Sequence, residues 1–169
     1  EAPAYQFPPL SLLKAPDKGN QPKEGKAWLQ ETVGQLQQIM EDFGVNATVT
    51  NVSRGPAVTR YEVQPAHGVK VSKIVALADD IKLNLAVPDV RIEAPIPGKA
   101  AVGIEVPNKE NSMVMFRELV ESEEFKKHKS KLAFAVGKDI GGKIMVSDIA
   151  KMPHLLIAGA TGSGKSVCI

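Results

Sequence analysis

The sequence predicts an α+β protein in which a small α-β-β-α-β-β layer is followed by the beginning of an α/β domain. In two segments, apolar residues recur at three- and four-residue spacing, and each is followed by two short segments in which apolar and polar residues alternate. Near the C-terminus, a short apolar run leads directly into a glycine-rich loop. That combination is typical of a strand, a loop and a helix start in an α/β domain.

The composition is that of a water-soluble globular protein. Of the 169 residues, 43% are hydrophobic and 24% are charged, which is enough to bury a core and excludes a disordered polymer. A single cysteine excludes an internal disulfide. The formal net charge is only +2, so total charge does not by itself indicate nucleic-acid binding. No apolar run approaches the roughly 18 residues that span a bilayer, so we expect no membrane contact by this segment.

Residues 1–24 are expected to form a proline-rich linker or docking arm, because prolines and polar residues interrupt every periodicity there. A short apolar patch in this arm could lie on a neighbouring surface, and the alternative is a sticky disordered end. The patch consists of Tyr5, Phe7, Leu10, Leu12 and Leu13.

The first helix is expected from Trp28 to Phe43, and Gly44 stands where a helix commonly ends in glycine. Alternating residues on both sides of the turn at 54–56 then predict a β-hairpin. The apolar stripe expected to be buried on the helix is Leu29, Val33, Leu36, Met40 and Phe43, widened by Trp28 and Ile39.

The second helix is expected over Val71 to Ala86, and Pro88 ends it. Residues 90–94 and 102–106 alternate around a proline-rich corner, which predicts a second hairpin or two edge strands. A third helix is expected to begin at Met113, and strands are expected at 132–136 and 143–146. The buried stripe of the second helix is Ile74, Leu77, Ala78, Ile81 and Leu85.

The motif that carries chemistry follows the apolar run at 153–158, which is expected to be a buried strand of a parallel sheet. It matches G-x-x-x-x-G-K-[ST], the P-loop pattern, in which glycines allow backbone N–H groups to surround phosphate oxygens. The predicted nucleotide-binding residues are Gly159, Ala160, Thr161, Gly162, Ser163, Gly164, Lys165, Ser166 and Val167.

Lys165 and Ser166 are the predicted catalytic residues of this motif. We expect Lys165 to reach the β- and γ-phosphates of ATP, and Ser166 to place its hydroxyl on Mg²⁺. A P-loop domain also needs further strands, an acidic residue near the Mg²⁺ and a group that orients the attacking water. None follows Gly164 in this sequence, so the 169-residue chain alone is expected not to hydrolyse ATP.

Four stretches of the chain resemble the FtsK/SpoIIIE family of bacterial DNA translocases. They are GPAVTRYEV at 55–63, RIEAPIPGK at 91–99, GIEVPN at 103–108 and MPHLLIAGATGSGKSV at 152–167. The resemblance implies an α domain over residues 25–148 and the truncated start of a RecA-like ATPase domain, the β domain, over 149–169.

The resemblance also implies a parent protein that uses ATP and Mg²⁺ to move double-stranded DNA through a homo-hexameric ring. Such proteins act in chromosome segregation at the division or sporulation septum. Membrane-spanning helices absent from this chain would hold the parent at the cytoplasmic side of the bacterial cell membrane. The residues that contact DNA are not identified by the resemblance.

Alternative interpretations stay open for the function and for several side chains. The chain could be a non-catalytic module for ring assembly or DNA contact, or a fragment of an unrelated P-loop NTPase. We expect His154 to be a packing residue and Cys168 a buried filler, and the cluster at 126–131 to be a solvated helix face rather than a DNA patch. The basic residues that could line a DNA channel, or could instead decorate a solvated face, are Arg54, Arg60, Lys70, Lys73 and Lys82.

Overall fold

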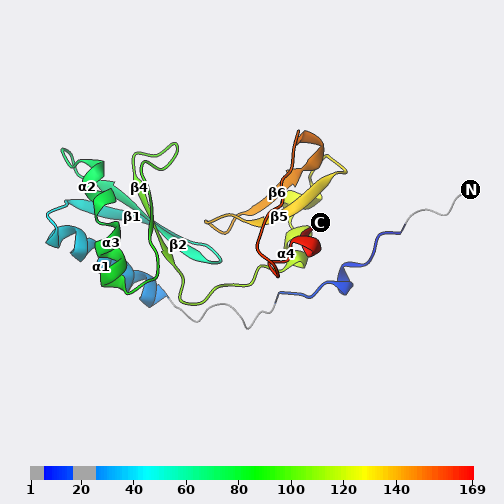
Figure 1. The fold of residues 1–169 in the computed structure, drawn as a ribbon, viewed down its shortest axis with the longest axis horizontal. Helices are drawn as coiled ribbons and strands as arrows, with labels where there is room; N and C mark the ends of the chain where they lie inside the picture. The colour runs from blue at the N-terminus through cyan, green and yellow to red at the C-terminus, as the bar shows by residue number, and fades with distance from the viewer. Residues whose placement is uncertain (1–5, 17–25) are drawn as a thin grey trace, which may run out of the picture.

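The computed structural model describes residues 6–16 and 26–169, so Tyr5 and most of the polar part of the predicted arm lie outside the described residues. Figure 1 shows two groups of elements: a four-stranded sheet with helices α1, α2 and α3, and a smaller hairpin, β5–β6, with α4. A segment after β4 connects the two groups. The predicted α+β class is confirmed, with antiparallel sheets.

Helix α1 runs over Lys26–Asp42 and ends in a glycine cap. Gly44 has φ +68°, its N–H donates to the carbonyl of Glu41, and the N–H of Val45 donates to the carbonyl of Met40 at 2.7 Å. This pair of hydrogen bonds forms a Schellman motif, which requires a residue in the left-handed conformation at the position where the sequence has glycine. The prediction for Phe43 is wrong: at the end of the helix it is 51% exposed, because the chain turns away there, while Leu36 and Met40 are fully buried.

The larger sheet has the strand order β1-β2-β4-β3, and all neighbours are antiparallel. The predicted hairpin of β1 and β2 is confirmed. Of the two possibilities for the later segments, the structure shows the hairpin, with β3 paired to β4, and the pairing of β2 with β4 joins the two hairpins. A bulge between Val49 and Asn51 shifts the alternation of β1, so that Val49 and Val52 both pack against the core. The strands are β1 Ala47–Arg54, β2 Val58–Pro65, β3 Arg91–Glu93 and β4 Val102–Pro107.

One core lies between the helices and one face of this sheet. Tyr61 and Ile104, which are register partners on β2 and β4, are fully buried, as are Leu36 of α1 and Ile81 of α3. The opposite face of the same strands carries charged residues, as the alternation predicts. The buried face therefore fixes the register of β2 and β4, because a slip by one residue would move these apolar side chains to the charged face.

The predicted helix over 71–86 is two helices, α2 over Val71–Ala76 and α3 over Ala78–Leu85. Leu77 between them has φ −80° and ψ 1°, and its N–H donates to the carbonyl of Ile74, a tight three-residue turn. Prediction of one continuous helix is thus wrong, but the predicted stripe holds: Ile74, Leu77 and Ile81 are all buried. The break lets all three side chains reach one core.

The second group of elements begins after the connecting segment at 109–115. Helices α4 over Phe116–Val120 and α5 over Glu123–Lys126 precede the antiparallel strands β5 over Ala133–Lys138 and β6 over Ile144–Asp148. The two predicted strands are confirmed, whereas the third helix begins at Phe116 and not at Met113, which is 74% exposed.

The predicted arm is represented by residues 6–16, which contain one 3-10 turn, η1, over Leu10–Leu12. Phe7 and Leu12 are 84% and 74% exposed. Leu13 is half-buried, and its carbonyl accepts a hydrogen bond from Nη1 of Arg117 at 3.5 Å. Within residues 6–16, the arm is thus linked to α4 by the hydrogen bond between Leu13 and Arg117.

Candidate functional site

The glycine-rich loop at 159–164 precedes a short helix, α6, over Lys165–Cys168. Gly162 and Gly164 have φ +82° and +89°, a region that other residues enter only with strain. A Cβ on Gly159 would lie 2.5 Å from Oγ of Ser163, so the Ser163 side chain would have to move. Gly162 and Gly164 thus meet a steric requirement of the loop.

The ammonium group of Lys165 is held by the loop itself. Its Nζ donates hydrogen bonds to the carbonyl oxygens of Gly159 and Ala160, the latter at 3.0 Å. The loop is closed further by a hydrogen bond from the N–H of Ser163 to the carbonyl of Ala160. A positive charge therefore lies within a ring of glycine-rich backbone, and Ser166 follows it, exposed, in the first turn of α6.

The apolar run at 153–158 is not a strand among the described residues, which contradicts the prediction. Leu155 and Leu156 are 52% and 89% exposed. A strand exists only through hydrogen bonds to a neighbouring strand, and no described segment pairs with this one. The predictions that His154 packs and that Cys168 is buried are also wrong: His154, in this segment, and Cys168, at the end of α6, are both exposed.

Two of the basic residues considered for a DNA channel, Arg60 and Lys82, lie in separate ion pairs. Nη2 of Arg60 lies 2.8 Å from Oε2 of Glu93 and 2.6 Å from Oε1 of Glu105, on the charged face of the larger sheet. Nη1 of Arg91 lies 3.1 Å from the other oxygen of Glu105. Lys82 pairs with its neighbour on α3, Asp79, at 2.9 Å. We call Arg60, Arg91, Glu93 and Glu105 the sheet charge cluster.

The hydrogen bond from Arg60 to Glu105 is the largest cause that raises the pKa of the Arg60 guanidinium above its usual value. Arg60 is thus committed to two carboxylates. In the sequence, Glu93 and Glu105 are simply polar positions of the alternating segments at 90–94 and 102–106. The signal that could have found the cluster is cross-strand register, since Arg60 and Arg91 are both direct partners of Glu105.

A second ion pair extends along the same face of the sheet. Nζ of Lys99 donates to both oxygens of Glu62, at 2.6 and 2.9 Å, and this hydrogen bond is the largest cause that lowers the pKa of Glu62. Glu62 is 8% exposed. In the basic cluster at 126–131, Lys127 pairs with Glu123 one helical turn away, as expected of a solvated face.

Both the four-stranded sheet and the P-loop lie in parts of the chain that match known protein families. Residues 7–108 match the family model described as the FtsK alpha domain, and residues 115–169 match that of the FtsK/SpoIIIE family. The chain belongs to the FtsK/SpoIIIE family. The resemblance found in four sequence stretches is therefore confirmed.

Curated members of the FtsK/SpoIIIE family align with almost the whole chain. The protein named DNA translocase FtsK of Clostridium acetobutylicum is 59% identical over 165 residues, and that of Clostridium tetani is 60% identical over 165 residues. Each alignment covers 98% of this chain and 22% of the relative, so the chain spans about a fifth of the length of these proteins.

Among solved structures, the pCW3 conjugation coupling protein TcpA, in its monomer form with ATPγS, is 16% identical and covers 81% of this chain and 39% of its own. The TM-score of this match is 0.37. Within residues 6–16 and 26–169, no helix has the length and apolar character needed to cross a membrane.

Proposed function

We propose that this chain is the N-terminal part of the motor of an ATP-driven double-stranded DNA translocase, which acts in chromosome segregation at the division or sporulation septum. The observation that carries the proposal is the order of its parts: an FtsK alpha domain precedes a P-loop whose lysine is held inside the loop. Relatives at 59–60% identity are named DNA translocase FtsK.

The loop residues fit a nucleoside triphosphate with Mg²⁺. The loop has no Cβ at its three glycine positions, and the ammonium of Lys165 already donates to two carbonyl oxygens of the loop. Phosphate oxygens carry more negative charge than carbonyls, so Lys165 would exchange its present acceptors for the β- and γ-phosphates. Ser166 would offer its hydroxyl to Mg²⁺. Bound ATP supplies the phosphoanhydride whose hydrolysis drives movement.

The remaining parts of the proposal concern the longer protein. Further strands would pair with residues 153–158 and bury their apolar side chains, which would complete a RecA-like sheet. Six such subunits would form a ring around double-stranded DNA, on the cytoplasmic side of the cell membrane. The division of this chain into an arm at 1–24, an α domain at 25–148 and the start of the ATPase domain at 149–169 stays a prediction.

The decisive experiment uses the protein extended to the length of its curated relatives. ATP hydrolysis is measured with and without double-stranded DNA for the wild type, for Lys165→Ala and for the control Lys151→Ala, which removes an exposed lysine outside the loop. We expect DNA to stimulate hydrolysis in the wild type and in the control, and Lys165→Ala to lower kcat by about 100-fold or more. A wild-type rate that DNA does not change would refute the translocase proposal.

One alternative function is a non-catalytic module for ring assembly or DNA contact, and it is favoured by the segment at 153–158, which pairs with no described strand. For the 169-residue chain alone, we expect ATP hydrolysis no faster than that of Lys165→Ala. Its mass in solution, measured with and without nucleotide, tests the module directly. Family membership excludes the third possibility, an unrelated P-loop NTPase.

A further inference from the structure

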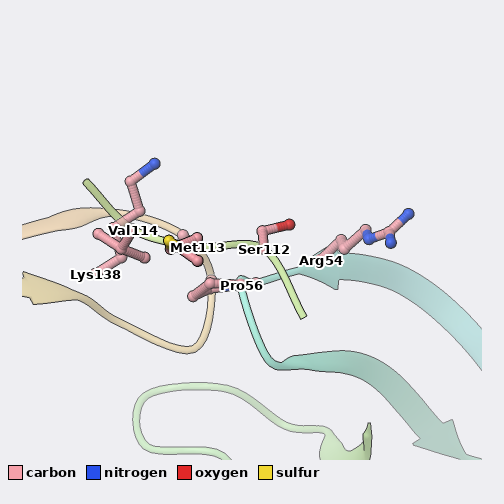
Figure 2. Close-up of a pocket in the computed structure, with 9 residues that line it drawn as sticks. Arg54, Pro56, Ser112, Met113, Val114 and Lys138 are labelled. Carbon is pink, nitrogen blue, oxygen red and sulfur yellow. The ribbon is translucent and has the colours of Figure 1, made fainter. Parts of the chain in front are cut away.

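Two turns from the two groups of elements lie against each other. They are the β1–β2 turn at residues 54–57 and the β5–β6 turn at residues 139–143, and Figure 2 shows the pocket beside their contact, lined by Pro56, Ser112 and Lys138 among others. A Cβ built on Gly55 would overlap the carbonyl oxygen of Ile140 and lie 2.8 Å from its carbon. The two backbones therefore touch directly, with no side chain between them.

The β1–β2 turn is held in its shape by Asn108. The side-chain Nδ2 of Asn108 donates to the carbonyl of Gly55 at 3.0 Å, and its Oδ1 accepts from Oγ1 of Thr59 at 2.7 Å. The backbone N–H of Asn108 donates to the carbonyl of Ala57 at 2.9 Å. Thr59 is fully buried and Asn108 is 8% exposed, so water does not replace these bonds readily.

The connecting segment adds one more bond to the same turn. The N–H of Ser112 donates to the carbonyl of Pro56 at 2.7 Å. The chain that leaves β4 thus returns along the tip of the β1–β2 hairpin before it enters α4. As a result, the segment at 109–115 is attached to the larger sheet at Asn108 and again at Ser112.

The β5–β6 turn is tied internally in a similar way. Oδ1 of Asp139 accepts from the N–H of Lys143 at 2.8 Å. The N–H of Asp139 donates to the carbonyl of Lys143, and its carbonyl accepts from the N–H of Gly142, at 2.9 Å each. Gly142 has φ +84°, and a Cβ on it would lie 3.5 Å from the carbonyl oxygen of Arg54. Both turns are thus held by their own hydrogen bonds where they meet.

We propose that these turns form a rigid joint that fixes the direction of the β5–β6 hairpin relative to the four-stranded sheet, with Asn108 as its positioning residue. Gly55 is the point of closest approach, and any side chain there must push the turns apart. After β6 the chain enters η2 over Ile149–Lys151, which Asp148 caps by accepting from the N–H of Ala150 at 3.0 Å. The joint therefore lies between the sheet and the segment that leads into the P-loop.

The joint is tested by the spread of a distance between the two groups. Nitroxide labels on Gln38→Cys in α1 and Lys126→Cys in α5, both exposed, are introduced after Cys168→Ser removes the native thiol. Double electron–electron resonance spectroscopy then measures the distribution of distances between the two labels. We expect a single narrow distribution in the otherwise unchanged chain and a distribution about twice as broad or more in Gly55→Ala.

Two further variants keep this test decisive. Gly141→Ala is the matched control, because Gly141 lies in the facing turn and a Cβ on it would meet only Oδ1 of Asp139, at 3.4 Å. Asn108→Ala removes the positioning side chain without adding bulk at Gly55, and it serves if Gly55→Ala does not fold, as judged by circular dichroism. A broad distribution in the parent chain, or a narrow one in both Gly55→Ala and Asn108→Ala, would overturn the proposal.

A functional consequence rests on the proposed function. In the extended protein, Gly55→Ala should keep ATP hydrolysis, since it lies outside the P-loop, but should lower the length of DNA moved per ATP by about threefold or more. An unchanged length of DNA moved per ATP would overturn this consequence. Loss of DNA-stimulated hydrolysis in the wild type would instead refute the translocase proposal and leave the distance measurement to decide the joint.

Discussion

Replacing Arg60 with methionine should lower the free energy of unfolding by about 2–3 kcal/mol. Methionine keeps a long apolar stem on the sheet but removes the cation that holds two carboxylates. The side chain of Glu105, which is 6% exposed, would lose hydrogen bonds at 2.6 and 3.1 Å, and Glu93 would lose its ion pair at 2.8 Å. The variant therefore leaves a buried negative charge with less compensation.

The magnitude follows from how much of the cluster remains. Removal of one partner from a buried ion pair typically costs about 3–5 kcal/mol. Arg91 still donates to Glu105 at 3.1 Å, and the side chains of Arg60 and Glu93 are 20% and 24% exposed, so solvent screens part of the loss. These two facts bring the expected value to about 2–3 kcal/mol, equivalent to a fall in Tm of about 4–12 °C for a chain of this size.

The assay is equilibrium unfolding in urea, followed by circular dichroism, because guanidinium chloride would screen the ion pairs under study. The matched control is Lys82→Met, which breaks the exposed pair with Asp79 and should leave the midpoint unchanged within error. Combining Arg60→Met with Glu105→Gln should cost less than the sum of the two single changes, by about 1 kcal/mol or more.

The reasoning fails if Arg60→Met shifts the urea midpoint no more than Lys82→Met does. Additive effects of Arg60→Met and Glu105→Gln would also contradict it, because they would show that the two side chains act independently. Either result would mean that solvent screens the sheet charge cluster in spite of its burial.

Three other predictions concern the core, a pair of glycines and acid stability. Leu36→Ala should cost about 2–5 kcal/mol in urea unfolding, because Leu36 is fully buried. Gly34→Ala, with open space in α1, should stabilise by about 0.5–1 kcal/mol, whereas Gly44→Ala at φ +68° should destabilise by about 1 kcal/mol; equal signs would contradict the cap. Lys99 lowers the pKa of Glu62, so this ion pair adds to the free energy of unfolding above the usual pKa of 4.5. The added stability is lost as pH falls through the lowered pKa. When the free energy of unfolding is measured from pH 7 down to pH 2, it should fall less steeply in Lys99→Met than in the wild type. An identical dependence on pH would refute this linkage.

Local patterns in the sequence were enough to place most helices and strands. The α1 stripe, the hairpin around residues 54–57 and the glycine cap at Gly44 could be predicted because each depends on short-range sterics and on one face being buried. The P-loop pattern likewise predicted that the loop needs the conformational freedom of glycine, and Gly162 and Gly164 have positive φ values. Prediction was wrong at Phe43 and at Leu77, where the chain bends so that the core, not the helix pattern, decides which side chains are covered.

What the sequence alone determined about this protein is its family, its α+β class and its phosphate-loop motif, because these depend on residue types at fixed short spacings. The tertiary structure decided which strands pair and which side chains meet. It placed Arg60 between Glu93 and Glu105 and set the tip at Gly55 against Ile140. It also left residues 153–158 unpaired with any strand of the described part of the chain. Those contacts join residues tens of positions apart, and hydrogen-bond pairing between distant segments is not encoded in the spacing of either one.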